Sequence, residues 1–390
     1  MLNLFSRSKL GPIGLDIGAE GVRMLQFGRA GYGLRVVAAG RCRFPAAARG
    51  ADAAIGNGSS LDAKVRRRLA VEAVREILKT VHFRGRQVVS CLRSDELAVK
   101  NIRLPHLPDN ELGGAVLWEA KERLGFEIVP DRLHYINAGE VRQGNDVRDE
   151  IIMLGVQEEV IRAHLEMLDE MRLVPLHVDA EPTALFAAYQ RFLRRAQDES
   201  TISVIVDIGL GSTKVVVARG QVILMIKSID LAGQKFNECV AKELGLSYSE
   251  AAHLRRRSSA ALGAGRESGD QVSWSVFDAI RGQVEALARE ISLCLRYCSV
   301  TFRGLRAGRI TVTGGEAYDA GLLRLLGETL NCECAVGEPL LGIDVGATDF
   351  DGDRRGVLTE WSVTAGLALR DLSIEPSHGK VDHDASRIPA

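Results

Sequence analysis

Two aspartates, Asp16 and Asp207, each stand at the end of a short apolar run and directly before a glycine-rich turn. The two stretches read IGLDIGAEGVR and ISVIVDIGLGSTKVVV. A carboxylate at the end of a buried strand suits phosphate and metal when glycines follow, because glycines let backbone N–H groups approach an anion. In the second turn, the hydroxyls of Ser212 and Thr213 can add hydrogen bonds. These residues favour a phosphate site, although a plain glycine-rich hairpin has the same local pattern.

The two stretches share one layout, and each opens one half of the chain. Both read as strand, tight turn and strand, since short apolar runs flank each turn. A unit that recurs in this way indicates a duplicated α/β protein, with a cleft between the two copies.

The composition excludes several classes of protein. A chain of 390 residues is long enough for two domains, each with a sizeable core. Its net charge of −1 gives no general attraction to nucleic acid or to an anionic membrane. No uncharged apolar run reaches ~18 residues, so we expect no transmembrane helix. Seven cysteines without a Cys-x-x-Cys pair fit a reducing cytoplasm better than a disulfide framework.

The elements that must position the aspartates follow from the hydrophobic periodicity. Apolar residues at helical spacing predict helices over Leu61–Val81 and Trp274–Val300. Between residues 93 and 178 the order β-α-β-β-α-β predicts a compact α+β unit inserted into the first half. A further helix starts near Pro182, which suits a first helical turn, and runs to about Arg195.

We therefore expect three structured units and a tail. The first domain comprises residues 1–92 and 179–197, and the inserted α+β subdomain comprises residues 93–178. The second domain comprises residues 198–373. Residues 374–390 are polar and contain prolines, so we expect a disordered tail.

Five segments, taken in chain order, resemble the motifs of the actin-like ATPase superfamily. LDIGAEGVR and VDIGLGSTK resemble its two phosphate loops, AEPTALFAAY its first connecting segment, TVTGGEAYDAGLLRLLGETL its adenosine motif and WSVTAGLALRDL its second connecting helix. The N-terminal MLNLFSRSKLGPIGLDIG and the insertion resemble the PilM family of type IV pilus assembly proteins, which is related to FtsA. The resemblance covers about residues 1–373. It implies a duplicated, ribonuclease H-like actin fold with an inserted α+β subdomain.

The resemblance also implies roles for individual residues. Asp16 and Asp207 would hold Mg²⁺ through water molecules against the phosphates of ATP, since Mg²⁺ keeps several of its waters. Glu181 would orient an attacking water, which makes these three the expected catalytic residues. The two turns would cradle the phosphates through Gly18, Ala19, Glu20, Gly21, Gly209, Leu210, Gly211, Ser212 and Thr213. The remaining nucleotide contacts would come from Gly233, Lys235, Arg255, Gly314, Gly315 and Glu316.

Two departures from the superfamily pattern favour a weak or slow enzyme. Glu20 would repel phosphate unless its carboxylate points away. Ala252 stands where relatives carry a glutamate that binds ribose, and a lost hydrogen bond costs on the order of 1 kcal/mol. We therefore expect at most a slow ATPase.

The implied function is a cytoplasmic, ATP-binding scaffold in a type IV pilus or related assembly machine. It would lie at the inner face of the inner membrane through its partners, with no span of its own. Its partner would be the N-terminal cytoplasmic peptide of a PilN-like inner-membrane protein, and a homo-oligomer or ring fits this family. Two alternatives stay open: a small-molecule kinase, and an FtsA-like filament-forming division protein. The sequence offers no second candidate base for a kinase, and its tail lacks an amphipathic stripe.

Overall fold

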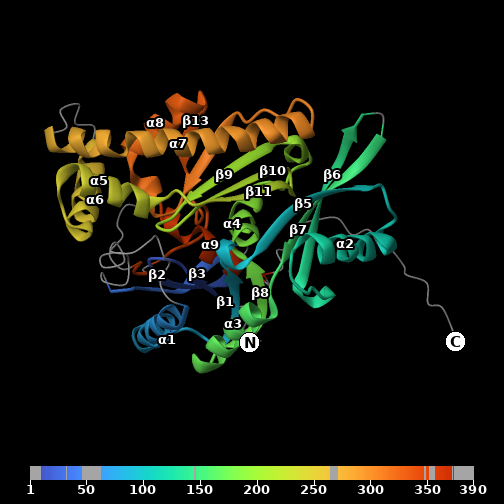
Figure 1. The fold of residues 1–390 in the computed structure, drawn as a ribbon. Coiled ribbons are helices and arrows are strands. Elements are labelled where there is room, and N and C mark those ends of the chain that lie inside the picture. The colour runs from blue at the N-terminus through green and yellow to red at the C-terminus, as the bar shows by residue number, and fades with distance from the viewer. Residues whose placement is uncertain are drawn as a thin grey trace.

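The computed structural model describes residues 10–31, 33–45, 63–144, 146–263, 271–346, 348–350, 356–370 and 372. The predicted disordered tail at residues 374–390 lies outside them. The described chain forms two lobes, each built on a five-stranded sheet, and a smaller three-stranded sheet lies beside them (Figure 1).

The first lobe is built on strands β1 (Leu10–Ile17), β2 (Gly21–Ala30), β3 (Gly33–Arg43), β4 (Gln87–Leu92) and β8 (Val174–Ala180). Across the sheet their order is β3-β2-β1-β4-β8. The first three strands form an antiparallel meander, whereas β4 pairs in parallel with both β1 and β8. Helices α1 (Ala63–Thr80) and α3 (Glu158–Glu170) pack on one face of this sheet.

The second lobe repeats this plan. Its strands are β9 (Ile202–Ile208), β10 (Thr213–Arg219), β11 (Val222–Ile229), β12 (Arg309–Thr313) and β13 (Glu333–Val336), in the order β11-β10-β9-β12-β13. Again three antiparallel strands are followed by two parallel ones. The predicted duplication is therefore confirmed. Helices α5 (Gly233–Leu244), α6 (Tyr248–Gly263), α7 (Gln271–Thr301) and α8 (Ala320–Leu330) complete this lobe.

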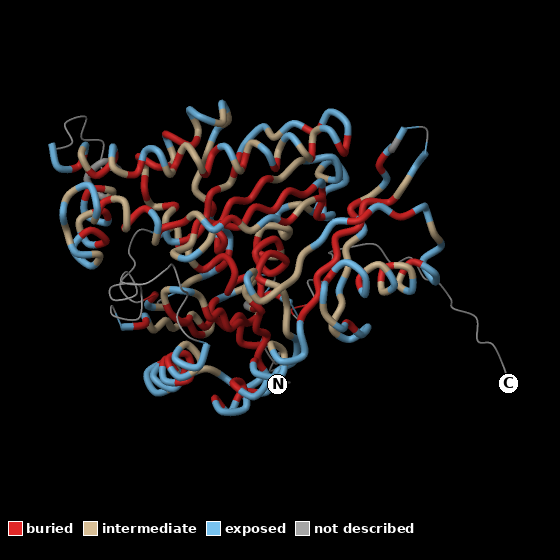
Figure 2. The backbone as a smooth tube through the Cα atoms, in the orientation of Figure 1, coloured by how far each residue is buried: buried red, intermediate tan, exposed pale blue. Residues whose placement is uncertain are grey.

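Two short helices form a buried layer between the sheets. They are α4 (Glu181–Gln190) and α9 (Ser362–Leu369), and every residue of α9 is buried (Figures 1 and 2). Helix α4 ends at Gln190, earlier than the predicted Arg195. The two helices cross so closely that a Cβ on Gly366 would overlap the carbonyl oxygen of Ala184. A residue without a side chain at position 366 is therefore required for this crossing.

The third sheet consists of β5 (Ala98–Pro105), β6 (Leu133–Gln143) and β7 (Asp146–Gly155), in the order β5-β7-β6. Successive residues of a strand face opposite sides, and both sides are used here. Ile151 and Met153 pack with helix α2 (Asp109–Arg123), whereas Ile152 and Leu154 join the core of the second lobe. The insertion is thus packed against the second lobe, although the chain enters it from β4 of the first lobe.

A buried carboxylate reinforces that contact. Glu150 on β7 accepts hydrogen bonds from Asn101 Nδ2 (3.2 Å) and from Arg103 Nε (2.8 Å). It also accepts one from the hydroxyl of Tyr297, which lies on α7. A fully buried charge is costly without such partners, so this group fixes the insertion against α7.

The insertion is smaller than the sequence analysis predicted. Strand β8, which was assigned to it, pairs with β4 in the first sheet, and Leu168 of α3 belongs to the first lobe's core. Local periodicity identifies a strand but does not say which sheet it joins. The separate sheet therefore ends with β7, while the remaining limits of the domains stay predictions.

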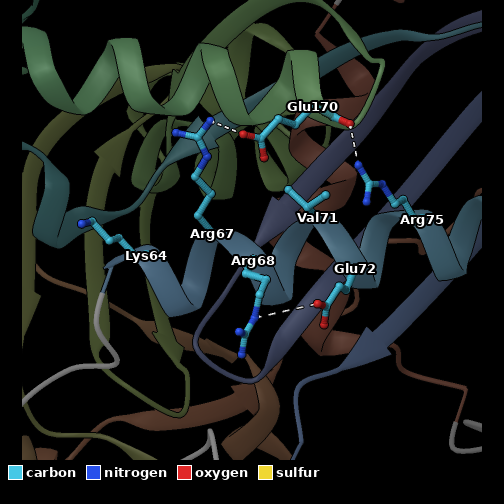
Figure 3. A pocket seen from close by; sticks show the side chains of 7 residues that line it. All are labelled: Lys64, Arg67, Arg68, Val71, Glu72, Arg75 and Glu170. Atoms are coloured by element: carbon cyan, nitrogen blue, oxygen red, sulfur yellow. Dashed lines mark hydrogen bonds and ion pairs between the residues drawn. The ribbon is translucent and has the colours of Figure 1, made fainter.

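Ion pairs hold α3 against α1 at the surface of the first lobe. Arg67 of α1 bonds Glu166 at 3.0 Å and Glu170 at 2.5 Å, and Arg75 donates to the backbone oxygen of Glu170. Arg67, Arg75 and Glu170 border a pocket of about 320 Å³ (Figure 3). Because the carboxylates of α3 already bind the arginines, we interpret the pocket as part of a helix–helix contact. None of the described helices has the length and apolar composition of a membrane span.

We expect Gly366→Ala to lower the free energy of unfolding by about 1–3 kcal/mol, because the added methyl group forces α4 and α9 apart. Urea denaturation of the two proteins measures the difference. Gly282→Ala is the matched control, since a Cβ on Gly282 in α7 meets nothing within 4 Å. That change should be neutral or stabilise by up to about 1 kcal/mol. Equal effects of the two changes would contradict the close-crossing argument.

Candidate functional site

The two acidic turns occupy equivalent positions in the two lobes. Asp16 lies near the end of β1 and pairs in register with Arg23 on β2, and Asp207 on β9 pairs in the same way with Lys214 on β10. In each lobe the carboxylate and its cross-strand cation approach each other. Asp16 Oδ2 lies 3.7 Å from Arg23 Nη1, and Asp207 Oδ2 lies 3.3 Å from Lys214 Nζ.

The turns face each other where the lobes meet. A Cβ built on Gly211 of the second turn would lie 3.2 Å from the Cβ of Ala19 in the first. Glu181, the first residue of α4, joins them through Lys214, whose Nζ lies 2.7 Å from Glu181 Oε1. We call Asp16, Arg23, Glu181, Asp207 and Lys214 the junction cluster. It brings together all three of the predicted catalytic residues.

The sequence analysis missed Lys214. Its ammonium contacts one carboxylate of the second sheet and one at the start of α4, and the residue is only 7% exposed. One signal was available, since Lys214 is a charged residue directly between the second turn and the apolar run Val215–Ala218. A buried lysine needs a partner of opposite charge, but the sequence alone did not identify the partner.

Both carboxylate oxygens of Glu181 are already engaged by the protein. Oε1 faces Lys214, while Oε2 accepts hydrogen bonds from the backbone nitrogen of Ser94 (3.1 Å) and from its hydroxyl (3.0 Å). Ser94 lies just after β4, where the chain leaves for the insertion. The predicted water-orienting carboxylate is therefore held in place by Ser94, at the base of the insertion, and by Lys214.

Burial and neighbouring charges shift the pKa values of the junction cluster. Burial raises the pKa of Asp16 to about 6, against the opposing effect of Arg23. Burial also raises the pKa of Asp207, although Lys214 opposes it. Burial would lower the pKa of Lys214, but Glu181 and Asp207 outweigh it and the pKa rises. Lys214 is therefore a permanent cation.

The first turn resolves the repulsion expected from Glu20. Its carboxylate pairs with Arg43 Nε at 3.1 Å and with Arg23 Nη2 at 3.4 Å, so its charge is balanced within the lobe. The turn is closed by a hydrogen bond from Gly18 N to Gly21 O (2.9 Å). This amide is therefore used inside the turn.

The second turn has a matching closure, from Gly209 N to Ser212 O at 3.2 Å. The hydroxyl of Thr213 donates to the carbonyl oxygen of Leu231, so that donor is used within the second lobe. The start of α5 docks on the same turn, because Gly233 N donates to Gly209 O at 3.0 Å. Gly233, which the sequence analysis assigned to nucleotide binding, thus lies beside the second turn.

The residues expected around adenosine fall into one connected group, with one exception. Gly314 follows β12 with φ of 90°, and a Cβ there would lie 2.7 Å from Asp207 Oδ1. Gly315 has open space at its Cβ position, and Glu316 pairs with Arg255. Lys235 is the exception, since it is half exposed and pairs with Glu238 on the surface of α5.

Arg255 fixes the geometry of this group. It is buried, and its Nη1 donates to Asn237 Oδ1 (2.7 Å) and to the carbonyl oxygen of Gly233 (3.2 Å). Burial lowers its pKa from the usual value, against the opposing effect of Asp319. Its contacts link α6 to the start of α5 and to the turn after β12. The described residues contain no group of three or more histidine, cysteine, aspartate or glutamate side chains arranged for a metal ion.

A family model for the type IV pilus assembly protein PilM matches residues 14–372. No curated protein matches the chain in sequence. Among solved structures, a PilM-PilN type IV pilus biogenesis complex matches with a TM-score of 0.71 and 23% identity, over 92% of this chain and 98% of that one. The ethanolamine utilization protein EutJ of Carboxydothermus hydrogenoformans matches with a TM-score of 0.52 and 12% identity, over 93% and 89%. MreB 5 of Spiroplasma citri bound to AMPPNP matches with a TM-score of 0.51 and 11% identity, over 93% and 96%.

The raised pKa of Asp16 predicts a pH-dependent cost to stability. The unfolded chain loses this proton near pH 3.8 and the folded protein near pH 6, so raising the pH between these values favours unfolding. Asp16→Asn should therefore raise the free energy of unfolding at pH 7.5 by on the order of 1–3 kcal/mol. The gain should vanish near pH 4. Urea denaturation across this range, without nucleotide or metal, measures it; a gain that is the same at every pH would rule out the charge as its cause.

Proposed function

Because the chain belongs to the PilM family of type IV pilus assembly proteins, we propose that it is an actin-like, nucleotide-binding scaffold of a pilus assembly machine. In this role it holds the N-terminal cytoplasmic peptide of a PilN-like inner-membrane protein. It thereby lies in the cytoplasm, at the inner face of the inner membrane, through that partner. The observation that carries the proposal is the pair of acidic turns that face each other between two lobes of equal topology.

The residues at the junction fit a magnesium–nucleotide complex. Asp16 and Asp207 are buried carboxylates, each already beside a cation, which suits a hydrated Mg²⁺ held through water better than direct coordination. When bound, the metal would neutralise charge on the β- and γ-phosphates. The Gly18 and Gly209 amides are used in the hydrogen bonds that close the two turns. The other backbone N–H groups of the turns would face the phosphates. The open space at Gly315 suits the close approach of a base or ribose.

Glu181 supports the expectation of slow hydrolysis. A carboxylate that orients an attacking water needs an oxygen available for that water. Here Ser94 supplies two donors to Oε2 and Lys214 supplies one to Oε1, so only the second lone pair of Oε1 remains for a water. The proposed activity is therefore nucleotide binding with at most slow turnover.

The proposal of partner binding draws on the structural match to a PilM-PilN complex and on the insertion. The insertion contacts both lobes, through Ser94 on one side and through Tyr297 on the other. A nucleotide that changes the angle between the lobes would therefore change the surroundings of the insertion. The nucleotide shifts the population of partner-binding conformations only by as much as its affinity differs between those conformations and the others.

Nucleotide binding is tested by calorimetry with ATP, with and without Mg²⁺. We expect Asp207→Ala to weaken binding in Mg²⁺ by about tenfold or more, which is about 1.4 kcal/mol, because a carboxylate that holds the hydrated metal is lost. Asp230→Ala, at an exposed aspartate just after β11, should leave binding unchanged. An unchanged affinity in Asp207→Ala would contradict the assignment of this turn. Rapid ATP consumption with a sugar or carboxylic acid would instead favour a small-molecule kinase.

Partner binding is tested with a fluorescent peptide from the N-terminus of the PilN-like protein of the same organism. We expect saturable binding at one peptide per chain, measured by anisotropy, and an affinity that changes when ATP is added. A scrambled peptide of the same composition is the control. Absence of saturable binding, with and without ATP, would refute the scaffold proposal.

A further inference from the structure

Lys214 is a cation that belongs to one lobe and reaches into the other. Its strand, β10, lies in the second sheet, where Asp207 is its cross-strand partner. Its ammonium lies 3.3 Å from Asp207 Oδ2 and 2.7 Å from Glu181 Oε1, and Glu181 begins α4 in the layer between the sheets. The ammonium therefore lies at the junction between the lobes.

The equivalent position in the first lobe behaves differently. Arg23 is the cross-strand partner of Asp16, but its other close carboxylate is Glu20, from the same turn. Both of these ion pairs stay inside the first lobe. The duplicated plan supplies a cation beside each aspartate. In the second lobe this cation is Lys214, which also contacts Glu181 and so links the second sheet to α4.

Lys214 also lies beside the second turn. A Cβ built on Gly209 would be 3.5 Å from the Lys214 ammonium, so the group sits next to the backbone expected to cradle phosphate. An ammonium has three N–H donors, and the two carboxylates account for two of them. The remaining donor suits an oxygen of an anion that enters between the turns.

The charge balance requires such a cation. Asp16, Glu181 and Asp207 are three buried carboxylates, and Arg23 and Lys214 are the cations paired with them. A polyphosphate brought to three buried carboxylates would be strongly repelled, because charges interact more strongly away from water. Without Lys214, only a bound metal and Arg23 would oppose that repulsion.

We infer that Lys214 is a phosphate-positioning cation of this site, which contacts the polyphosphate end of a nucleotide and lowers the site's dependence on a divalent metal. The inference rests on the proposed nucleotide binding and adds the group that receives the phosphates. It assigns to one side chain part of the charge neutralisation that Mg²⁺ would supply.

The test is the affinity for fluorescent ATP in Mg²⁺ and in EDTA, for the full chain and for Lys214→Met. We expect Lys214→Met to lose about tenfold or more affinity in EDTA beyond the loss that the unaltered protein shows, since a buried charge contact is worth at least ~1.4 kcal/mol. Lys214→Arg keeps the charge and should restore part of the binding in EDTA. Lys227→Met, at an exposed lysine of the neighbouring strand β11, should behave like the unaltered protein.

The outcomes separate the inference from the proposed function. If EDTA affects Lys214→Met and the unaltered protein equally while both bind ATP, Lys214 is only structural and the inference is wrong. If the unaltered protein binds no nucleotide in either buffer, the proposed nucleotide binding fails, and the inference fails with it.

A second variant keeps the test valid if Lys214→Met does not fold. Lys214→Met combined with Glu181→Gln removes one of the two carboxylates that the lost ammonium would leave unpaired. The combined variant should melt cooperatively and show the same added sensitivity to EDTA. Binding in EDTA as tight as that of the unaltered protein would overturn the inference.

Discussion

The bridge from Asp207 through Lys214 to Glu181 constrains how the two lobes can be placed. Each of these groups is buried, and a buried charge is tolerated only when a partner of opposite charge lies close by. Asp207 and Lys214 lie in the second sheet and Glu181 begins the helical layer between the sheets, so separating that layer from the second sheet would leave charges unpaired. The ion pairs of the junction cluster therefore help to hold the lobes in position, together with apolar packing.

The layer of α4 and α9 complements this bridge. Gly366 lets the two helices cross at backbone contact, and Trp361, just before α9, is fully buried against the first sheet's core. Beneath the site, the hydroxyl of Tyr189 bonds Ser362 at 2.9 Å and Thr313 at 3.1 Å, which links α4, α9 and β12. This network holds the start of the Gly314 turn in a fixed place. The ends of strands and helices that carry the site are therefore supported by packed, hydrogen-bonded neighbours.

The insertion is attached to this body at two points of different character. Ser94, at its base, binds Glu181 in the junction cluster, and Glu150 on its sheet binds Tyr297 of the second lobe. One face of its sheet also joins the second lobe's apolar core. Movement of one lobe against the other would therefore act on the insertion at both points. Coupling between the junction cluster and the insertion needs no long pathway, because Ser94 at the base of the insertion bonds Glu181 directly.

The sequence by itself predicted the two acidic turns, the duplication, the family, and Asp16, Glu181 and Asp207 as the carboxylates of one site. These features are local, because a turn's glycines and a strand's apolar run lie within a few residues of each other. Only the tertiary structure decided that β8 joins the first sheet, that Lys235 lies away from the site, and that Arg255 pairs with Glu316. It also decided that Lys214 reaches Glu181. Each of these depends on contacts between segments far apart in the chain. Periodicity and composition are local or averaged properties, so they do not predict such contacts.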